Sequence, residues 1–228
     1  MLEKIAKNVW SVPHPLAVFG VLHLNTRMTI IRLSDGSIWL HSPVPCTDEL
    51  CKEIDALGRI KYIVAPSCLH HLFIGKWMIR YPYAATFVAR GLQRKRTDIA
   101  FTQSLSNNLQ NPWKDEIDFL CLQGIPATNE CVFFHRASQT LVVTDLLFYL
   151  PEATGLTKLY ARLWFNDFYA HPRIPALVKA AVKDKKAFAL CLETIKGWDI
   201  QNLALCHHTI PTENVREQVH KALDEYSS

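Results

Sequence analysis

The sequence lacks an apolar run long enough to span a lipid bilayer, and its first residues, Met-Leu-Glu-Lys-Ile-Ala-Lys, have no long apolar core followed by a cleavage site. These absences argue against an integral membrane protein and against a secretory leader. We therefore expect a soluble, cytoplasmic protein that has no membrane partner.

The sequence also lacks a large excess of charge of either sign. The 25 basic and 21 acidic residues leave a formal net charge of +4, and the only local concentration of basic side chains is residues 90–96, Arg-Gly-Leu-Gln-Arg-Lys-Arg. A basic segment this short does not by itself indicate nucleic-acid binding. We expect a solvated loop there and no nucleic-acid partner.

Cysteine is present but has no recognisable pattern. The seven cysteines are an odd number, spread from Cys46 to Cys206 without the paired spacing of a zinc ribbon. This distribution favours reduced thiols in the cytoplasm over a disulfide framework.

The composition fits one α/β domain. The chain has 228 residues, of which 49% are hydrophobic and 20% charged, which is ordinary for a globular protein with a large core. We expect a single domain over residues 1–228.

The first half of the chain contains a hairpin and a crossover. Residues 29–33 and 38–41 are β-rich runs on either side of Ser-Asp-Gly-Ser, a pattern typical of a β-hairpin. Thr47 as N-cap and Gly58 as stop predict a helix between them, followed by a strand at 62–65. Because a strand-helix-strand crossover joins parallel neighbours, the sheet should be partly parallel.

Proline should end the strand that precedes this hairpin. Residues 8–12 form a short edge-strand candidate, and Pro13 and Pro15 follow it directly.

The second half predicts another hairpin and several helices. Residues 131–135 and 140–144 are apolar β-rich runs, and a tight turn between them would pair His135 with Thr140 and place Glu130 opposite Asp145. Further expected elements are helices at 72–80, 156–165, 174–182 and 187–198, strands at 85–89, 118–123 and 203–206, a last helix from Thr212, and a loop with at most one helix at 90–113.

The chain is organised around residues 61–77. A buried strand stopped by Pro66 leads into a short loop with Cys68, His70 and His71, at the strand end where open α/β sheets place chemistry. Imidazole and thiolate are ligands that zinc and iron accept. The alternatives are histidines that cap or pack under the next helix, and a Cys68 that is either a nucleophile with a histidine base or a buried thiol.

Three strand ends carry possible ligands in the same way. Besides His70 and His71, Asp145 follows the strand at 140–144, and His207-His208 follows the strand at 203–206. Strand ends on one rim of a sheet converge, so these side chains could hold one metal ion.

These segments resemble the metallo-β-lactamase-fold superfamily, in which a His-x-His-x-Asp-His signature follows a strand, an Asp follows a later strand and a late His precedes the C-terminal helix. Here the signature falls on Pro66, Cys68, His70 and His71, with Gly75 behind it, in Val-Ala-Pro-Ser-Cys-Leu-His-His. The segments Leu-Ser-Asp-Gly-Ser-Ile-Trp-Leu-His-Ser-Pro and Phe-Phe-His-Arg-Ala-Ser-Gln-Thr-Leu-Val-Val-Thr-Asp are similar to a branch of this superfamily carried as a domain of unknown function. The resemblance implies a four-layer αββα sandwich.

The departures from the signature bear on the metal count. Pro66 and Cys68 replace the first two histidines, and residues 124–128 have no histidine where the family has its third. The resemblance then implies that the first metal site is absent and that the second consists of His70, His71, Asp145 and either His207 or His208. Cys68 and Glu130 are weaker candidates. At most one zinc or iron ion is expected, or none.

Two functions follow from the resemblance. One is a metal-dependent hydrolase that activates water at an open coordination position of the metal. Four protein ligands would close that position. The other is a non-catalytic module on the same fold that recognises a partner. The substrate would be a small molecule bound by loops within residues 90–128. The aromatic run at residues 163–169 could fill the core, line a pocket or form the interface of a homodimer.

Overall fold

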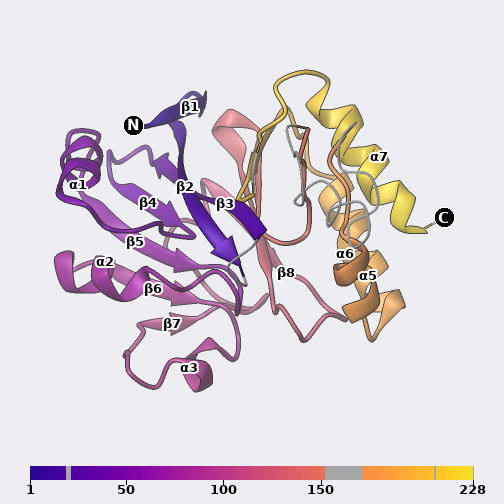
Figure 1. Ribbon diagram of the computed structural model, residues 1–228, viewed down its shortest axis with the longest axis horizontal. Helices are drawn as coiled ribbons and strands as arrows, with labels where there is room; N and C mark the ends of the chain where they lie inside the picture. The colour runs from indigo at the N-terminus through magenta and orange to yellow at the C-terminus, as the bar shows by residue number, and fades with distance from the viewer. Residues whose placement is uncertain (19–21, 152–170, 208, 228) are drawn as a thin grey trace.

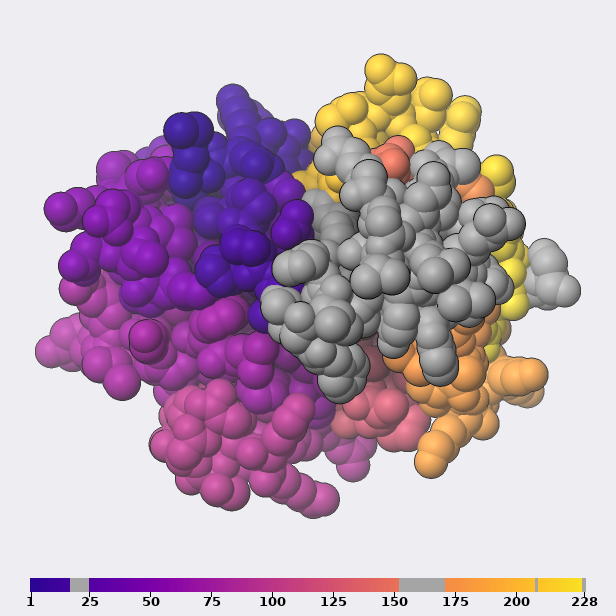
Figure 2. Space-filling model, in the orientation of Figure 1, coloured from indigo at the N-terminus to yellow at the C-terminus, as the bar shows by residue number. Residues whose placement is uncertain are grey.

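The computed structural model describes residues 1–18, 22–151, 171–207 and 209–227. Two β-sheets lie face to face, with helices α1, α2 and α3 on the side of one sheet and α5, α6 and α7 on the side of the other (Figure 1). The space-filling view shows the same division, with the N-terminal half on one side and the C-terminal helices on the other (Figure 2). This is the expected four-layer αββα sandwich.

The first sheet has the order β1-β2-β3-β4-β5-β6-β7 and the second the order β11-β10-β9-β8. The elements of the first half are β1 (Glu3–Ala6), β2 (Val9–Val18), β3 (Leu22–Arg32), β4 (Ile38–His41), α1 (Asp48–Asp55), β5 (Ile60–Ala65), α2 (Ile74–Arg80), β6 (Ala85–Val88), α3 (Leu92–Lys95) and β7 (Gln103–Ser104). Those of the second half are β8 (Ile117–Cys121), β9 (Cys131–His135), η1 (Arg136–Ser138), β10 (Thr140–Val143), α5 (Ala176–Ala181), α6 (Lys185–Lys196), β11 (Asn202–Leu205) and α7 (Val215–Ser227).

Three hydrophobic cores separate the four layers. Alternate residues of a strand point to opposite faces, so in the first sheet Ile30, Leu40 and Ile63 pack under α1 and α2. Their neighbours Ile31, Trp39 and Val64 pack instead against the second sheet. The third core lies between the second sheet and helices α6 and α7.

Local sequence signals account for several elements. The Asp-Gly hairpin is confirmed: β3 and β4 are antiparallel, and the Leu33 amide donates to the Ser37 carbonyl at 2.8 Å. The Thr47 hydroxyl caps α1 by accepting from the Leu50 amide at 3.3 Å. Strands β4 and β5 are parallel, as the crossover predicted.

The expectation that Pro13 and Pro15 end a strand is wrong. Strand β2 runs through both, with Pro13 opposite Arg27 and Pro15 opposite Asn25. The reason is that β1 pairs with β2 only as far as Ser11. Beyond Ser11 no strand of the described residues pairs with this side of β2, and an edge strand tolerates residues without an N–H.

Other boundaries shift for local reasons. Asn214 has a left-handed backbone (φ 47°), so the last helix begins at Val215 rather than Thr212. Pro175 stands at the N-cap of α5, which starts two residues later than expected. Residues 90–113 contain the short α3 and β7. The helix expected at 156–165 lies outside the described residues.

The cysteines are not all reduced. Cys121 and Cys131 form a disulfide between β8 and β9, where the two residues face each other in the strand register. The expectation of seven free thiols is therefore wrong, and the cysteines no longer argue for a cytoplasmic location.

Within the described part of the chain, no helix is long and apolar enough to cross a membrane.

Candidate metal centre

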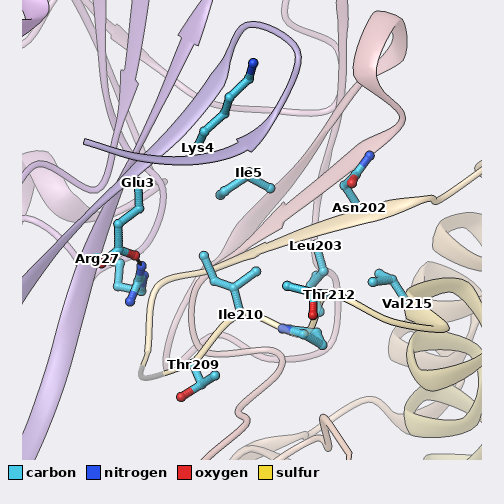
Figure 3. Close-up of a pocket in the computed structure, with 11 residues that line it drawn as sticks. Glu3, Lys4, Ile5, Arg27, Asn202, Leu203, Thr209, Ile210, Thr212 and Val215 are labelled. Atoms are coloured by element: carbon cyan, nitrogen blue, oxygen red, sulfur yellow. Dashed lines mark hydrogen bonds and ion pairs between the residues drawn. The ribbon is translucent and has the colours of Figure 1, made fainter. Parts of the chain in front are cut away.

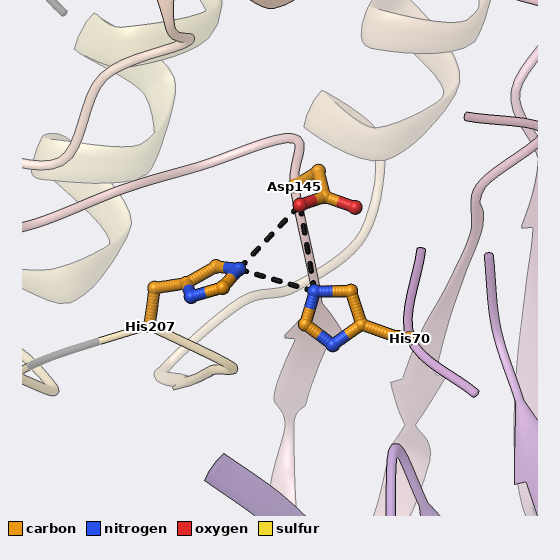
Figure 4. A group of neighbouring side chains, drawn as sticks. All are labelled: His70, Asp145 and His207. Carbon is orange, nitrogen blue, oxygen red and sulfur yellow. Dashed lines mark hydrogen bonds and ion pairs between the residues drawn. The ribbon is translucent and has the colours of Figure 1, made fainter. Parts of the chain in front are cut away.

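Three ligand atoms from distant parts of the chain converge where the two sheets meet. His70 Nε2 lies 3.1 Å from His207 Nε2, and each of these atoms lies 3.4 Å from Asp145 Oδ1 (Figure 4). The side chains of His70, Asp145 and His207 are only 7%, 11% and 7% exposed, so the group is shielded from bulk water.

The strand register brings Asp145 and His207 together. Strands β10 and β11 are parallel, with Val143 opposite Leu205. Asp145 and His207 each follow two residues later, so both leave the second sheet at the same edge.

His70 reaches the same point from the first sheet through a turn after β5. Pro66 follows the end of this strand, and the Ser67 hydroxyl accepts hydrogen bonds from the Leu69 amide at 3.2 Å and the His70 amide at 3.1 Å. Serine closes such turns because its hydroxyl substitutes for a backbone carbonyl.

The outer atom of each of the three side chains has its own partner. His70 Nδ1 lies 2.8 Å from Ser42 Oγ, and the Ser67 hydroxyl donates to Asp145 Oδ2 at 3.3 Å. His207 Nδ1 donates to the Asn25 carbonyl oxygen at 3.3 Å, which leaves the lone pair on Nε2. Because the outer atoms are engaged, both Nε2 atoms and Oδ1 point inward, the arrangement that supporting hydrogen bonds give to metal ligands.

Electrostatics favour a cation between these side chains. Burial opposes ionisation of Asp145, but His70 and His207 hold the pKa of its carboxyl far below the ordinary range. Burial likewise opposes charge on His70, but the charge and hydrogen bond of Asp145 keep the pKa of this imidazole well above its usual value. Burial lowers the pKa of His207, which leaves that ring neutral. A proton on His70 thus balances the Asp145 carboxylate, and metal ions displace protons of this kind.

The residues fit a metal ion. Around four-coordinate zinc, with bonds of about 2.0–2.1 Å, neighbouring ligand atoms stand about 3.3 Å apart. The observed separations of 3.1, 3.4 and 3.4 Å match this spacing. Two histidines and one carboxylate on one face of a site also suit non-haem iron. Within the described residues no further His, Cys, Asp or Glu atom joins the group.

His71, also expected as a ligand, does not belong to this group. Its Nδ1 lies 3.3 Å from Arg96 Nη1, and burial together with Lys95 and Arg96 lowers the pKa of its imidazole to about 4. His208, the alternative to His207, lies outside the described residues.

The two weaker candidates lie near the group but do not join it. The Cys68 thiol donates to the Arg90 carbonyl at 3.4 Å, and burial raises its pKa. Glu130 accepts from the Thr144 amide at 2.7 Å, beside Asp145 as the hairpin predicted, and burial raises the pKa of its carboxyl to about 7.

Residues 124–128 stand where the resemblance would place the third histidine of the first metal site. There the Thr128 carbonyl accepts a hydrogen bond from the Cys68 amide at 2.9 Å. His135 is remote from this point: it pairs with Thr140 at the hairpin turn, and its Nδ1 lies 2.7 Å from Ser138 Oγ.

Sequence reasoning missed the residues that support the ligands. Ser42 and Ser67 follow the ends of β4 and β5, and this shared position was the available signal. His41 was missed as well: it is fully buried, stacks on Trp39 at 5.5 Å between ring centres, and its Nε2 has no partner in the described part of the chain.

Comparison with solved structures places the chain among metallo-β-lactamase-fold proteins. The metallo-β-lactamase DIM-1 has a TM-score of 0.68 at 12% identity, covering 100% of this chain and 97% of that one. A metallo-β-lactamase from Pontibacter korlensis has a TM-score of 0.65 at 12% identity, covering 98% of each chain. The Flv1 flavodiiron core from Synechocystis sp. PCC6803 has a TM-score of 0.67 at 12% identity, covering 99% of this chain and 60% of that one.

Identities this low show the shared fold alone, and no curated protein matches the sequence. A family model described as a domain of unknown function, DUF4336, matches residues 6–163, which is more than half of the chain. The chain therefore belongs to the DUF4336 family and has the metallo-β-lactamase fold.

Proposed function

We propose that this protein is a hydrolase-like enzyme with one metal ion, zinc or iron, held by His70, Asp145 and His207. The observation that carries the proposal is the triangle of inward-facing ligand atoms, whose outer atoms are each occupied by Ser42, Ser67 or the Asn25 carbonyl. The proposed ligands differ from the sequence-based set in leaving out His71.

The protein groups would supply charge and orientation. An ion at this position would act as a Lewis acid and lower the pKa of a bound water toward neutrality. The Asp145 carboxylate offsets part of the added positive charge, and the hydrogen bonds of Ser42 and Ser67 hold the ligands in place. Burial of the three side chains keeps the centre in a medium where electrostatic effects are strong. We infer a small-molecule ester, amide or phosphoester as substrate.

The fold neighbours support metal chemistry without selecting the reaction. They include metallo-β-lactamases and a flavodiiron core, proteins whose names denote different metal centres. The name of the first group leaves the metal unspecified and that of the second denotes iron, which is why the metal of this chain has to be identified directly.

The alternative is a non-catalytic binding module on the same fold. The observation that favours it is that the ligand atoms also satisfy one another, because the raised pKa of His70 allows it to pair as a cation with Asp145. A permanent His-Asp-His cluster of this kind would need no metal.

Elemental analysis separates the two functions. Protein purified without chelator is expected to contain about one zinc or iron per chain, and the variants His70→Ala, Asp145→Ala and His207→Ala are expected to lose it. His71→Ala is the matched control: it removes an imidazole from the same loop and should retain the metal. Absence of metal from the wild type after reconstitution, or loss only in His71→Ala, would overturn the proposal.

A further inference from the structure

A surface pocket of about 470 Å³ lies beside the loop that carries His70. It is bounded by Arg90 after β6, by residues 105–108 after β7 and by the β8–β9 connection. Its volume is in the range of pockets that bind small molecules.

The lining of this pocket is rich in hydrogen-bond donors and has one cation. The polar side chains of the described lining residues are those of Arg90, Ser106, Asn107, Asn108, Gln123 and Asn129. None of the described lining residues is acidic. Amide N–H groups and a guanidinium without a competing carboxylate favour an oxyanion.

The Arg90 guanidinium is available to a ligand. Within the described residues Arg90 has no ion-pair partner, whereas Arg96 in the same segment is engaged by Asp98 at 2.7 Å. Arg90 is also solvent-exposed, so a ligand can reach it.

A second cavity shows the opposite case. It has about 330 Å³, lies between β1, β3 and β11, and also contains an arginine, Arg27 (Figure 3). There Glu3 forms an ion pair with Arg27, and the Arg27 Nε donates to Ser11 Oγ at 2.9 Å. An anion in that cavity would have to compete with a carboxylate that is already bound.

The walls of the first pocket are fixed before any ligand binds. Asn107 pairs with the backbone of Cys121, accepting from its amide at 2.7 Å and donating to its carbonyl at 3.2 Å. Gln123 donates to the same carbonyl at 3.0 Å, and the disulfide to Cys131 joins the strands beneath. Preformed walls reduce the entropic cost of binding.

The pocket shares a wall with the proposed metal centre. The Cys68 thiol, two residues before His70, donates to the carbonyl of Arg90 at 3.4 Å, and the Cys131 amide donates to the Pro66 carbonyl at 2.8 Å. The basic segment 90–96 packs on this loop as well, because Lys95 Nζ donates to the Cys68 carbonyl at 2.7 Å. The segment was expected to be a solvated loop; Arg90, Arg94 and Lys95 are exposed, although residues 92–95 form the short helix α3. These basic side chains add positive potential beside the pocket.

We propose that this pocket binds the carboxylate or phosphate group of a small molecule, with Arg90 as the charged contact. A second step rests on the proposed hydrolase function: the substrate of that enzyme carries an anionic group that lies at Arg90 while its scissile bond lies at the metal centre. Binding of the anion itself does not require the metal.

Calorimetric titration of chelator-treated protein with inorganic phosphate and with succinate, at constant ionic strength, tests the site. At least one of the two is expected to bind one-to-one. Arg90→Gln should raise its dissociation constant about tenfold or more, since a charge-assisted hydrogen bond is lost. Arg94→Gln is the matched control, because Arg94 is exposed in the same segment and does not line the pocket.

The outcome decides the ligand class and the proposal. Binding of phosphate alone assigns a phosphate group, binding of succinate alone a carboxylate, and binding of both a general oxyanion site. No binding of either anion at millimolar concentration, or dissociation constants of the two variants that differ by less than threefold, would overturn the proposal. Because the titration uses metal-free protein, its failure leaves the metal result untouched, and the converse also holds.

Discussion

His70 and His207 are 137 positions apart in the sequence, yet their Nε2 atoms lie 3.1 Å apart with Asp145 beside both. Each ring comes from a different sheet, so the contact joins the two halves of the sandwich at one edge. A cation held there would tie the two halves together and would bind the folded chain in preference to the unfolded one.

Metal should therefore raise the thermal stability. A ligand at about 100 times its dissociation constant stabilises the folded state by about 2.7 kcal/mol. For a chain of this size that corresponds to an increase in Tm of roughly 5–10 °C. Differential scanning calorimetry of chelator-treated protein with and without added zinc or iron measures the shift. Asp145→Ala should abolish it and His71→Ala should preserve it; an equal shift in both variants would place the ion elsewhere.

The Ser42 hydroxyl should contribute to metal affinity without contacting the ion. It lies 2.8 Å from His70 Nδ1 and fixes the orientation of the ring. Loss of such a supporting hydrogen bond weakens metal binding by about 10–100-fold. Competition with a chromophoric chelator measures the affinity of Ser42→Ala. Ser34→Ala, which removes an exposed hydroxyl bonded to Glu116, is the control and should bind like the wild type.

Local chemistry predicted most of the fold but only part of the centre. The Thr47 cap, the Asp-Gly turn and the pairing of His135 with Thr140 depend on residues close in sequence, and all three are confirmed. Pro13 and Pro15 were misjudged because the tolerance of a strand for proline depends on whether another strand pairs there, which local sequence does not show.

The choice between His70 and His71 depends on tertiary contacts. The two histidines are adjacent and chemically identical, so the sequence offers no reason to separate them. Ser42 and Asp145 hold the first toward the centre, and Arg96 lies against the second. The disulfide was missed for a related reason: Cys121 and Cys131 meet only through the register of β8 and β9, across a connection that has no strand pattern.

His135 should make stability depend on pH through a site remote from the metal centre. Burial lowers the pKa of its imidazole, so the unfolded chain binds this proton more readily than the folded one. The contribution of His135 to the free energy of unfolding is complete above the pKa of about 6.5 that its imidazole has in the unfolded chain. This contribution is lost as the pH falls from there toward the lower pKa in the folded chain.

Urea unfolding of the wild type and His135→Gln between pH 8 and pH 4.5 checks this effect. The difference in unfolding free energy should favour the wild type at pH 8 and shrink as the pH falls. Stability curves of the two proteins that stay parallel across the range would show that His135 does not titrate with folding.

A comparison of alanine substitutions at Gly124 and Gly36 tests how closely the β8–β9 connection is packed. Their backbones are nearly the same, with φ of 80° and 78°, so Gly→Ala at either position brings a similar left-handed strain of about 1–2 kcal/mol. A Cβ at Gly124 would lie 2.2 Å from the Asp184 carbonyl oxygen, whereas at Gly36 the nearest atom, 3.8 Å away, belongs to the flexible Arg32 side chain. Gly124→Ala should thus be the more destabilising by roughly 2 kcal/mol or more, since overpacking of this kind costs about 1–3 kcal/mol and here the obstacle is backbone. Chemical denaturation of both variants measures the difference, and equal losses would mean that the connection moves freely away from α6.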